Sequence, residues 1–287
     1  MKFAKFWSRQ EGEASDREGR RFNTTARGWS DDAPEAAAAM ARSIAERVAQ
    51  LLAGGQTKLQ RYQYGDRPMP EPVIREFNDG AGLRAAVTRN VYGALVLNTR
   101  DLMFVDVDVE PPKLSAAVVF SGIASLFGKK PSPEAAAPDQ IVERFRRVAE
   151  LHGLGVRVYR TAGGYRGLVT SAAFGPADGN ARALLDEFGT DTLYVRLCEK
   201  QNSFRARMTP KPWRIELRPP TVSFPYETPK DRSRFDAWQS EYDAASGRFA
   251  VCEFIAAVGP GQSAGLFDDL VAFHDEQTKA STPLPLA

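Results

Sequence analysis

Residues 102–110 place the strongest constraint on how this chain folds. Apolar and acidic residues alternate there with a period of two, the pattern of a β-strand that buries one face. The valines of the alternation are Val105, Val107 and Val109, and the acids are Asp106, Asp108 and Glu110. Only Phe104 departs from it, because it falls on the acidic side. The pattern therefore predicts one strand with three carboxylates on the same face.

This acidic face is unfavourable unless something offsets its charge, since like charges on a strand repel and acids are poor strand formers. A bound cation would remove the repulsion, and oxygen ligands at i and i+2 suit Mg²⁺ or Mn²⁺. Asp106 and Asp108 are the candidate metal ligands. Two arrangements without a metal stay open: a solvated acidic face, or ion pairs of these aspartates with Arg205 or Arg207.

Two arginine-rich segments follow the acidic strand. The first is a predicted hairpin turn over residues 160–166, where glycines allow close approach of a ligand and arginines offer paired donors. The second is residues 205–214, in which Arg205 and Arg207 would share one face of a strand. An acidic metal site beside arginines is what phosphoryl or nucleotidyl transfer requires. The candidate nucleotide- or phosphate-binding residues are Arg160, Thr161, Gly163, Gly164, Arg166, Arg205, Arg207, Lys211 and Arg214.

The remaining pattern predicts an α+β protein with a mostly antiparallel central sheet and packed helices. An apolar strand over residues 92–98 is expected to turn at 99–101 and pair with the acidic strand, which would place the acidic strand well inside the sheet. A second hairpin is expected over 155–170, between predicted helices. We expect a basic and aromatic arm over 1–30, one domain over 31–280 with a flexible insertion at 111–138, and a disordered tail at 281–287.

The N-terminal arm permits two interpretations. Its basic residues alternate with aromatics such as Phe6, Trp7, Phe22 and Trp29, a composition that can bind phosphates and stack on bases. Alternatively, the arm packs its aromatic side chains on the domain and exposes its charges to solvent.

Composition restricts the kind of metal site. The 287 residues carry 38 Lys and Arg against 36 Asp and Glu, so net charge favours no class of partner. Two cysteines (Cys198 and Cys252) make neither a disulfide framework nor a zinc pattern, and two histidines (His152 and His274) leave carboxylates as the expected ligands.

No secretory signal and no membrane-length apolar segment is evident, so we expect a cytoplasmic protein without a membrane partner.

Four motifs carry a resemblance to known proteins. RNVYGALVLNT, FVDVD, YRTAGGYR and FRARMTPKPWR, in this order within roughly residues 85–215, resemble a widespread family of bacterial proteins without an assigned activity. More distantly, the order resembles the archaeo-eukaryotic primase superfamily, which includes the primase-polymerases. In that superfamily an Asp-x-Asp/Glu strand precedes a hairpin with Ser-x-His, and a later strand carries a third acid.

Asp106 and Asp108 match the first primase motif. Glu216, or else Asp191, would be the third acid, and Arg166 or Thr161 stands where Ser-x-His is expected. The resemblance implies a primase-like fold and a metal-dependent nucleotidyltransferase that acts on nucleic acid, with a nucleoside triphosphate and Mg²⁺ or Mn²⁺. Its catalytic residues would be Asp106, Asp108 and Glu216. Two alternatives are an inactive nucleic-acid-binding or scaffold protein of the same fold, and a phosphohydrolase of nucleotides or nucleic acid.

Overall fold

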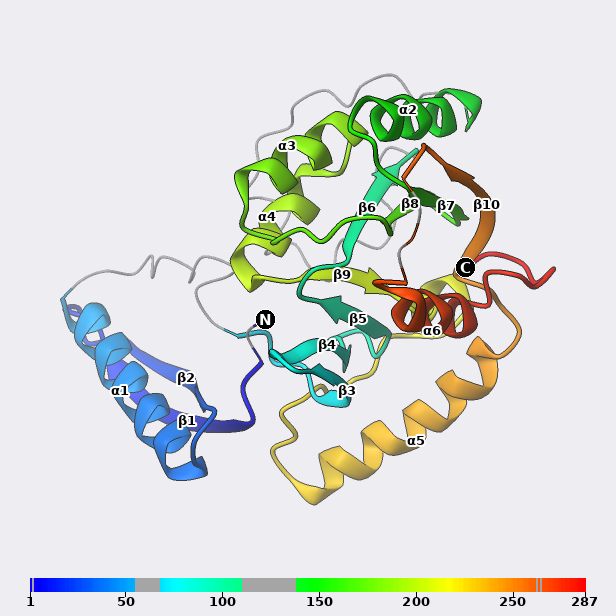
Figure 1. Ribbon diagram of the computed structural model, residues 1–287. Helices are drawn as coiled ribbons and strands as arrows, with labels where there is room; N and C mark the ends of the chain where they lie inside the picture. Colours follow the sequence, from blue (N-terminus) through cyan, green and yellow to red (C-terminus); the bar gives the residue numbers. More distant parts are fainter. Residues whose placement is uncertain (2, 55–67, 110–137, 262, 264) are drawn as a thin grey trace. The chain divides into compact units, whose positions relative to one another are not determined.

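The computed structural model describes residues 1, 3–54, 68–109, 138–261, 263 and 265–287 (Figure 1). Helices and antiparallel sheets give the expected α+β fold. The chain divides into two compact units, Met1–Arg100 with Leu197–Arg248 and Asp101–Arg196 with Phe249–Ala287. Both units take residues from the range 31–280, and whether they act as one domain stays a prediction. The insertion predicted at 111–138 lies outside the described residues, apart from the residue at which a helix begins.

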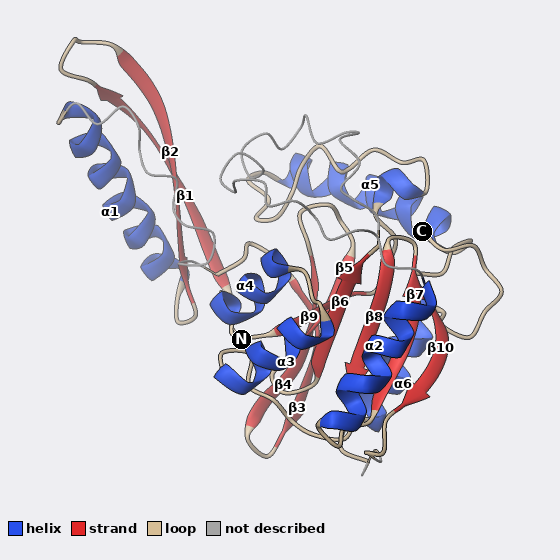
Figure 2. Ribbon diagram, turned by 90° about the horizontal axis from the view of Figure 1, so that it is seen from above, coloured by secondary structure: helices blue, strands red, loops and turns tan. Residues whose placement is uncertain are grey.

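The first unit begins with a β-hairpin and a helix, β1 (Phe6–Ser15), β2 (Arg21–Ser30) and α1 (Pro34–Ala53). The expected N-terminal arm is thus regular, with Trp7 opposite Trp29 in the hairpin. A side chain at Gly28 would overlap the backbone of Ala37 and Ala41, so the glycine permits close contact between hairpin and helix. Figure 2 shows α1 lying along the two strands.

The rest of the first unit contains a four-stranded antiparallel sheet in the order β3-β4-β5-β9. Its strands are β3 (Val73–Asp79), β4 (Gly82–Arg89), β5 (Leu95–Thr99) and β9 (Phe204–Arg207). A short 3-10 helix, η3 (Pro212–Arg214), and the helix α5 (Pro229–Ser246) follow. Tyr242 of α5 is buried and its hydroxyl donates to the carbonyl oxygen of Pro210 at 2.6 Å, which fixes the chain between β9 and η3.

The second unit contains another antiparallel sheet, in the order β10-β7-β8-β6. Its strands are β6 (Met103–Asp108), β7 (Val156–Thr161), β8 (Gly164–Val169) and β10 (Cys252–Val258), and its helices are α2 (Pro138–Leu151), α3 (Gly179–Phe188) and α6 (Asp268–Thr278). The helix α4 (Thr192–Gln201) crosses the division between the units. Figure 2 shows α2 across one face of this sheet, where Phe145 packs on Gly167. On the other face His274 of α6 contacts the ring of Tyr159.

The structure corrects two expectations about the strands and one about the tail. β5 pairs with β4 and β9, whereas the acidic strand β6 pairs with β8 and is an edge strand of its sheet. The predicted hairpin of residues 92–108 is therefore wrong, because these two strands belong to different sheets. The C-terminal residues are held by backbone hydrogen bonds to the segment just before β10. The amide of Ala250 donates to the carbonyl of Pro285, and the carbonyl of Ala250 accepts from the amide of Ala287, both at 3.0 Å.

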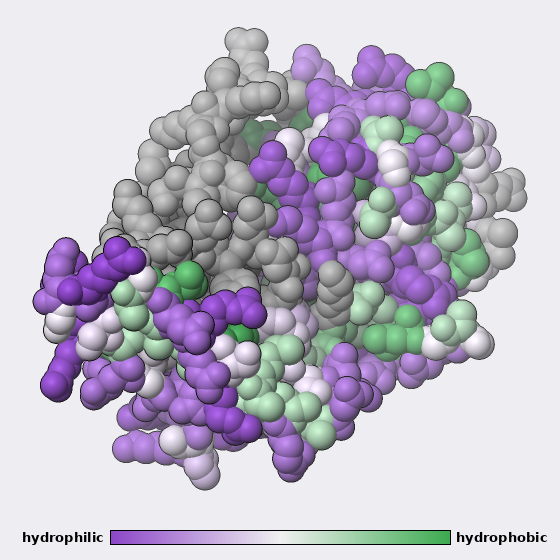
Figure 3. Space-filling view, turned by 90° about the vertical axis from the view of Figure 1, so that its left-hand side faces the viewer, coloured by the Kyte–Doolittle hydropathy of each residue, from purple (hydrophilic) through white to green (hydrophobic). Residues whose placement is uncertain are grey.

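Hydrophilic residues form most of the described surface visible in Figure 3, and hydrophobic residues appear there in small separate groups. None of the helices that the structure describes is long and apolar enough to cross a membrane.

Candidate functional site

The acidic strand has the two faces that its alternation predicts. In β6, Asp106 lies opposite Arg166 and Asp108 opposite Gly164 on β8, so the two aspartates share one face of the sheet. Val105 and Val107 are buried on the other face. Phe104 lies on the aspartate side, buried against α6 through the ring of His274. The face assignment of both aspartates is confirmed.

Asp106 is held by a buried arginine of the neighbouring strand. Arg166 Nε donates to Asp106 Oδ1 at 3.0 Å and Nη2 lies 3.4 Å from Oδ2. The Arg166 side chain is 3% exposed, whereas that of Asp106 is 34% exposed. Burial alone lowers the pKa of Arg166, but the charges and hydrogen bonds of its neighbours, Asp106 first, raise it above its ordinary value. Arg166 is thus a permanent cation that fixes Asp106 and leaves part of its carboxylate to solvent.

Arg166 also contacts a buried cysteine. Its Nη1 lies 3.6 Å from Sγ of Cys252, at the start of β10. Together with Asp106, this contact surrounds the guanidinium with protein groups. The buried position of Arg166 therefore favours a structural role over the phosphate-binding role that the sequence suggests.

Asp108 is exposed at the end of β6. The backbone continues to pair beyond it, because Val109 N donates to the carbonyl of Gly163 in the β7–β8 turn at 3.0 Å. The turn residues are thereby placed next to the acidic end of β6. The backbone of Asp191, the alternative third acid, contacts β6 directly: the Asp191 amide donates to the carbonyl of Asp106 at 3.1 Å. The Asp191 carboxylate accepts from two amides at the start of α4 and so acts as a helix cap.

The β7–β8 hairpin forms where the sequence predicts it, but its residues have local roles. Arg160 Nε donates to Glu253 of β10 at 2.9 Å, and the arginine side chain is 55% exposed. Thr161 Oγ1 accepts from the amide of Gly163 at 3.4 Å inside the turn. A side chain at Gly164 would overlap the carbonyl of Val107, so this glycine allows β6 and β8 to pair closely. Strand packing therefore accounts for the geometry of this turn without a ligand.

Glu216, the expected third acid, is not on a strand. It lies in a turn after η3, is exposed, and has a positive φ of 63°. It belongs to the first unit, whereas Asp106 and Asp108 belong to the second. Within the described parts of the chain, no group of three or more His, Cys, Asp or Glu side chains is arranged to hold a metal ion. Asp106 and Asp108 on β6 are therefore the candidate metal ligands in this part of the chain.

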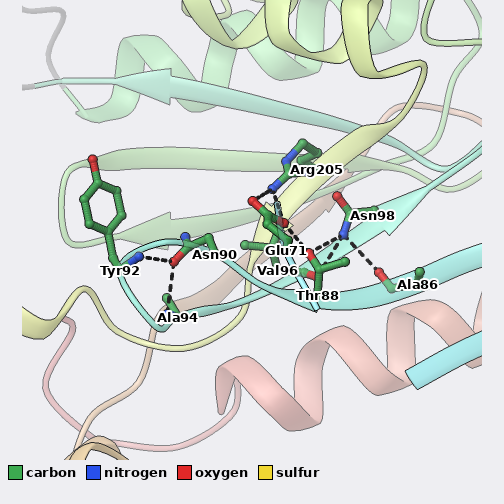
Figure 4. Close-up of polar contacts among 9 residues, drawn as sticks. All are labelled: Glu71, Ala86, Thr88, Asn90, Tyr92, Ala94, Val96, Asn98 and Arg205. Atoms are coloured by element: carbon green, nitrogen blue, oxygen red, sulfur yellow. Dashed lines mark hydrogen bonds and ion pairs between the residues drawn. The ribbon is translucent and has the colours of Figure 1, made fainter. Parts of the chain in front are cut away.

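A second polar cluster lies inside the first unit (Figure 4). Arg205 Nη2 donates to both carboxylate oxygens of Glu71, at 2.8 and 2.9 Å, and the Thr88 hydroxyl donates to the same carboxylate. Asn98 Nδ2 lies 3.0 Å from the Thr88 oxygen and 3.1 Å from the carbonyls of Ala86 and Val96. All four polar side chains of this cluster are buried. Arg205 thus pairs with a carboxylate that sequence reasoning missed.

The other basic residues of the run after β9 are placed differently. Arg207 shares the face of Arg205, as expected, and its Nη1 donates to the carbonyl of Thr209 at 3.2 Å. The ammonium of Lys211 lies 5.6 Å from the centroid of the Trp213 ring. Lys211 and Arg214 are both half-buried at the ends of η3. Lys211 therefore borders the exposed side chain of Trp213, and Arg214 directly follows this tryptophan in the sequence.

Sequence reasoning also missed a titratable group on the face of the second sheet that α6 covers. His274 is fully buried, and its Nδ1 lies 3.0 Å from Oδ1 of Asp275. Arg157 donates to Oδ2 of the same aspartate at 2.7 Å and to the Tyr159 hydroxyl at 2.8 Å. Burial raises the pKa of Tyr159 and lowers that of His274. Only the adjacent His-Asp pair was visible in the sequence, without a motif to indicate its partners.

No protein-family model, no curated protein and no solved structure matches this chain.

Proposed function

We propose that this protein is a metal-dependent nucleotidyltransferase of primase-like architecture that acts on nucleic acid. The observation that carries the proposal is the position of Asp106 and Asp108 on one face of β6, beside the β7–β8 turn. The primase-like affinity and the polymerase chemistry come from the motif resemblance. The cytoplasm, with its nucleoside triphosphates, is the compartment that we expect for this activity.

The donor set fits a small hard cation. Both aspartates offer carboxylate oxygens, which are the preferred ligands of Mg²⁺ and Mn²⁺. Asp106 keeps one part of its carboxylate exposed while Arg166 orients it, and Asp108 is exposed. Asp106 and Asp108 would hold the ion, which when bound would neutralise charge on the phosphates that are transferred.

The protein's own residues would then bind and orient the nucleotide. Arg160 is exposed at the edge of the β7–β8 turn and could exchange Glu253 for a phosphate, since an exposed ion pair contributes little stability. Lys211 and Arg214, in the first unit, would bind the nucleic-acid backbone. Asp191, which belongs to the same unit as Asp106 and Asp108, remains the candidate third acid.

One observation favours a second candidate, a nucleic-acid-binding protein of this fold without catalysis. The ion pair between Arg166 and Asp106 satisfies this aspartate without a metal. In that case the acidic strand is a structural element, and only the basic residues contribute to function.

Calorimetric titration of Mn²⁺ separates these candidates. Asp108→Asn is the informative variant, because Asp108 is exposed and the change keeps its size. Asp186→Asn, on the exposed side of α3, is the matched control. The proposal predicts saturable binding that nucleoside triphosphate strengthens, that Asp108→Asn weakens at least tenfold, and that the control retains.

Equal binding in both variants, or none in the wild type, would leave the binding protein as the better candidate. Where binding is found, extension of a primed template tests transfer directly. Consumption of nucleotide without primer or template would instead identify a phosphohydrolase.

A further inference from the structure

An aromatic pair in the first unit includes an exposed tryptophan that lies beside a lysine. Trp213 of η3 keeps 44% of its surface exposed, although large aromatic side chains are usually well buried. The ring of Tyr92 meets it edge to face, with centroids 5.1 Å apart and planes at 87°. We call Tyr92 and Trp213 the aromatic platform.

Hydrogen bonds fix the backbone on both sides of the platform. Asn90 Oδ1 accepts from the amides of Tyr92 and Ala94, at 3.0 and 3.1 Å, and so fixes the turn between β4 and β5 (Figure 4). In the same view Tyr92 stands apart from the Glu71–Arg205 cluster. On the other side, Trp213 lies within η3, where Arg214 N donates to the carbonyl of Lys211 at 2.9 Å. A rigid aromatic surface loses little conformational entropy when a ring stacks on it.

The sequence around Trp213 is mostly basic. The ammonium of Lys211 lies over the Trp213 ring, and Arg214 follows directly in the sequence. Residues 211–218 hold three basic side chains and one acid, namely Lys211, Arg214, Arg218 and Glu216. An exposed ring next to cations is the combination by which proteins bind unpaired bases and the phosphates that flank them.

We propose that the aromatic platform stacks an unpaired base of a single-stranded nucleic acid, with Lys211 and Arg214 on the adjacent phosphates. The base would lie on the exposed part of Trp213, and Tyr92 would keep that ring in place. In a duplex the bases stack on each other and are closed to such a platform. The proposal specifies that the nucleic acid is single-stranded. It rests on the proposed function for the assumption that the ligand is a nucleic acid.

Fluorescence anisotropy with the full chain and a labelled oligothymidylate of about fifteen nucleotides tests the inference, since single-strand sites span roughly 4–16 nucleotides. EDTA is present, so that no metal chemistry contributes. Trp213→Ala should weaken binding roughly tenfold, the effect of losing one stacked base, and Trp213→Phe should restore part of it. Ile74→Ala, an exposed apolar side chain on β3, is the matched control and should bind as the wild type does.

Two further arms separate stacking from charge. A duplex of the same length should bind wild type and Trp213→Ala equally. Lys211→Ala with Arg214→Ala should reduce the slope of log affinity against log salt by about 0.7 for each phosphate that the protein no longer neutralises, while Trp213→Ala should keep the slope. Circular dichroism verifies that each variant is folded.

The outcomes distinguish this inference from the proposed function. If the wild type binds the oligonucleotide and Trp213→Ala binds equally well, the platform is overturned and the proposed function stands. An equal loss of single-strand and duplex binding would likewise overturn it, because stacking is specific to unpaired bases. If the wild type binds neither nucleic acid, both proposals fail. Loss of single-strand binding in Trp213→Ala, together with loss of transfer activity in Asp108→Asn, would support both.

Discussion

Glu71 and Arg205 form a buried ion pair although 134 positions separate them in the sequence. Glu71 lies before β3 and Arg205 within β9, and both side chains are almost fully removed from solvent. One nitrogen of the arginine donates to both carboxylate oxygens, and the Thr88 hydroxyl adds a third hydrogen bond. The pair therefore joins the segment before the first strand of the sheet to its last strand. Such pairs are retained only when their hydrogen bonds compensate for desolvation.

Removing the charge of Glu71 should destabilise the protein strongly. Glu71→Gln leaves the guanidinium of Arg205 buried without a counter-charge, which we expect to lower the free energy of unfolding by roughly 3 kcal/mol. Urea denaturation followed by circular dichroism measures the change. Glu76→Gln, an exposed carboxylate on β3, is the control and should differ from wild type by less than about 0.5 kcal/mol. Similar stability of both variants would show that the pair does not hold the sheet together.

Features that depend on residues close together in the sequence were predicted correctly. The alternation of valines and aspartates identified the two faces of β6, and the turn residues Ala162 and Gly163 identified the β7–β8 hairpin, because each depends on neighbours in the sequence. The α+β class followed from the same patterns.

Pairing between distant segments was not predictable in this way. The expected partner of β6 was the strand just before it, but short loops also connect strands of different sheets. An ion pair of Asp106 or Asp108 with Arg205 or Arg207 was one alternative to a metal site, yet the structure pairs Asp106 with Arg166 and Arg205 with Glu71. The sequence shows which charged residues would need a counter-charge if they were buried. The arrangement of the strands then determines which of them form ion pairs.

Asp106 should matter for stability, in contrast to Asp108. Asp106→Asn removes the charge beside the buried Arg166, and we expect a loss of about 1–3 kcal/mol in the free energy of unfolding. Asp108→Asn should cost less than about 0.5 kcal/mol, since this side chain is exposed. Thermal unfolding of the two variants side by side makes the comparison. An equal effect of both changes would mean that the Arg166 pair contributes no stability. A metal-binding defect in Asp106→Asn must therefore be interpreted together with its stability.

Gly164→Ala should disturb the pairing of β6 with β8. The added methyl group would overlap the carbonyl oxygen of Val107, and the backbone on both strands limits any shift. We expect a loss of about 1–3 kcal/mol, measured by denaturant unfolding. Gly179→Ala is the control, because a methyl group there meets open space at the start of α3. If Gly164→Ala is as stable as this control, the close approach of the two strands is not required, and a ligand-binding role of Gly164 regains support.

Stability should fall as the solution becomes more acidic than pH 6.5, because of His274. Burial, with a smaller effect from the charge of Arg166, lowers the pKa of this imidazole below its ordinary value of 6.5, against the opposing hydrogen bond with Asp275. Below pH 6.5 the unfolded chain therefore binds a proton that the folded chain does not bind. The free energy of unfolding then rises with pH and decreases as the pH is lowered through this range.

Urea denaturation at pH 7.5 and pH 5.5 measures this dependence. A full proton of difference over one pH unit corresponds to about 1.4 kcal/mol, so we expect a decrease of about 1 kcal/mol at the lower pH. His274→Gln should flatten the dependence, whatever its own stability, since it removes the titrating group. His152→Gln removes the other histidine, which contacts Glu187 at the surface, and should retain the decrease. An unchanged pH dependence in His274→Gln would assign it to other groups and contradict the role of the buried imidazole.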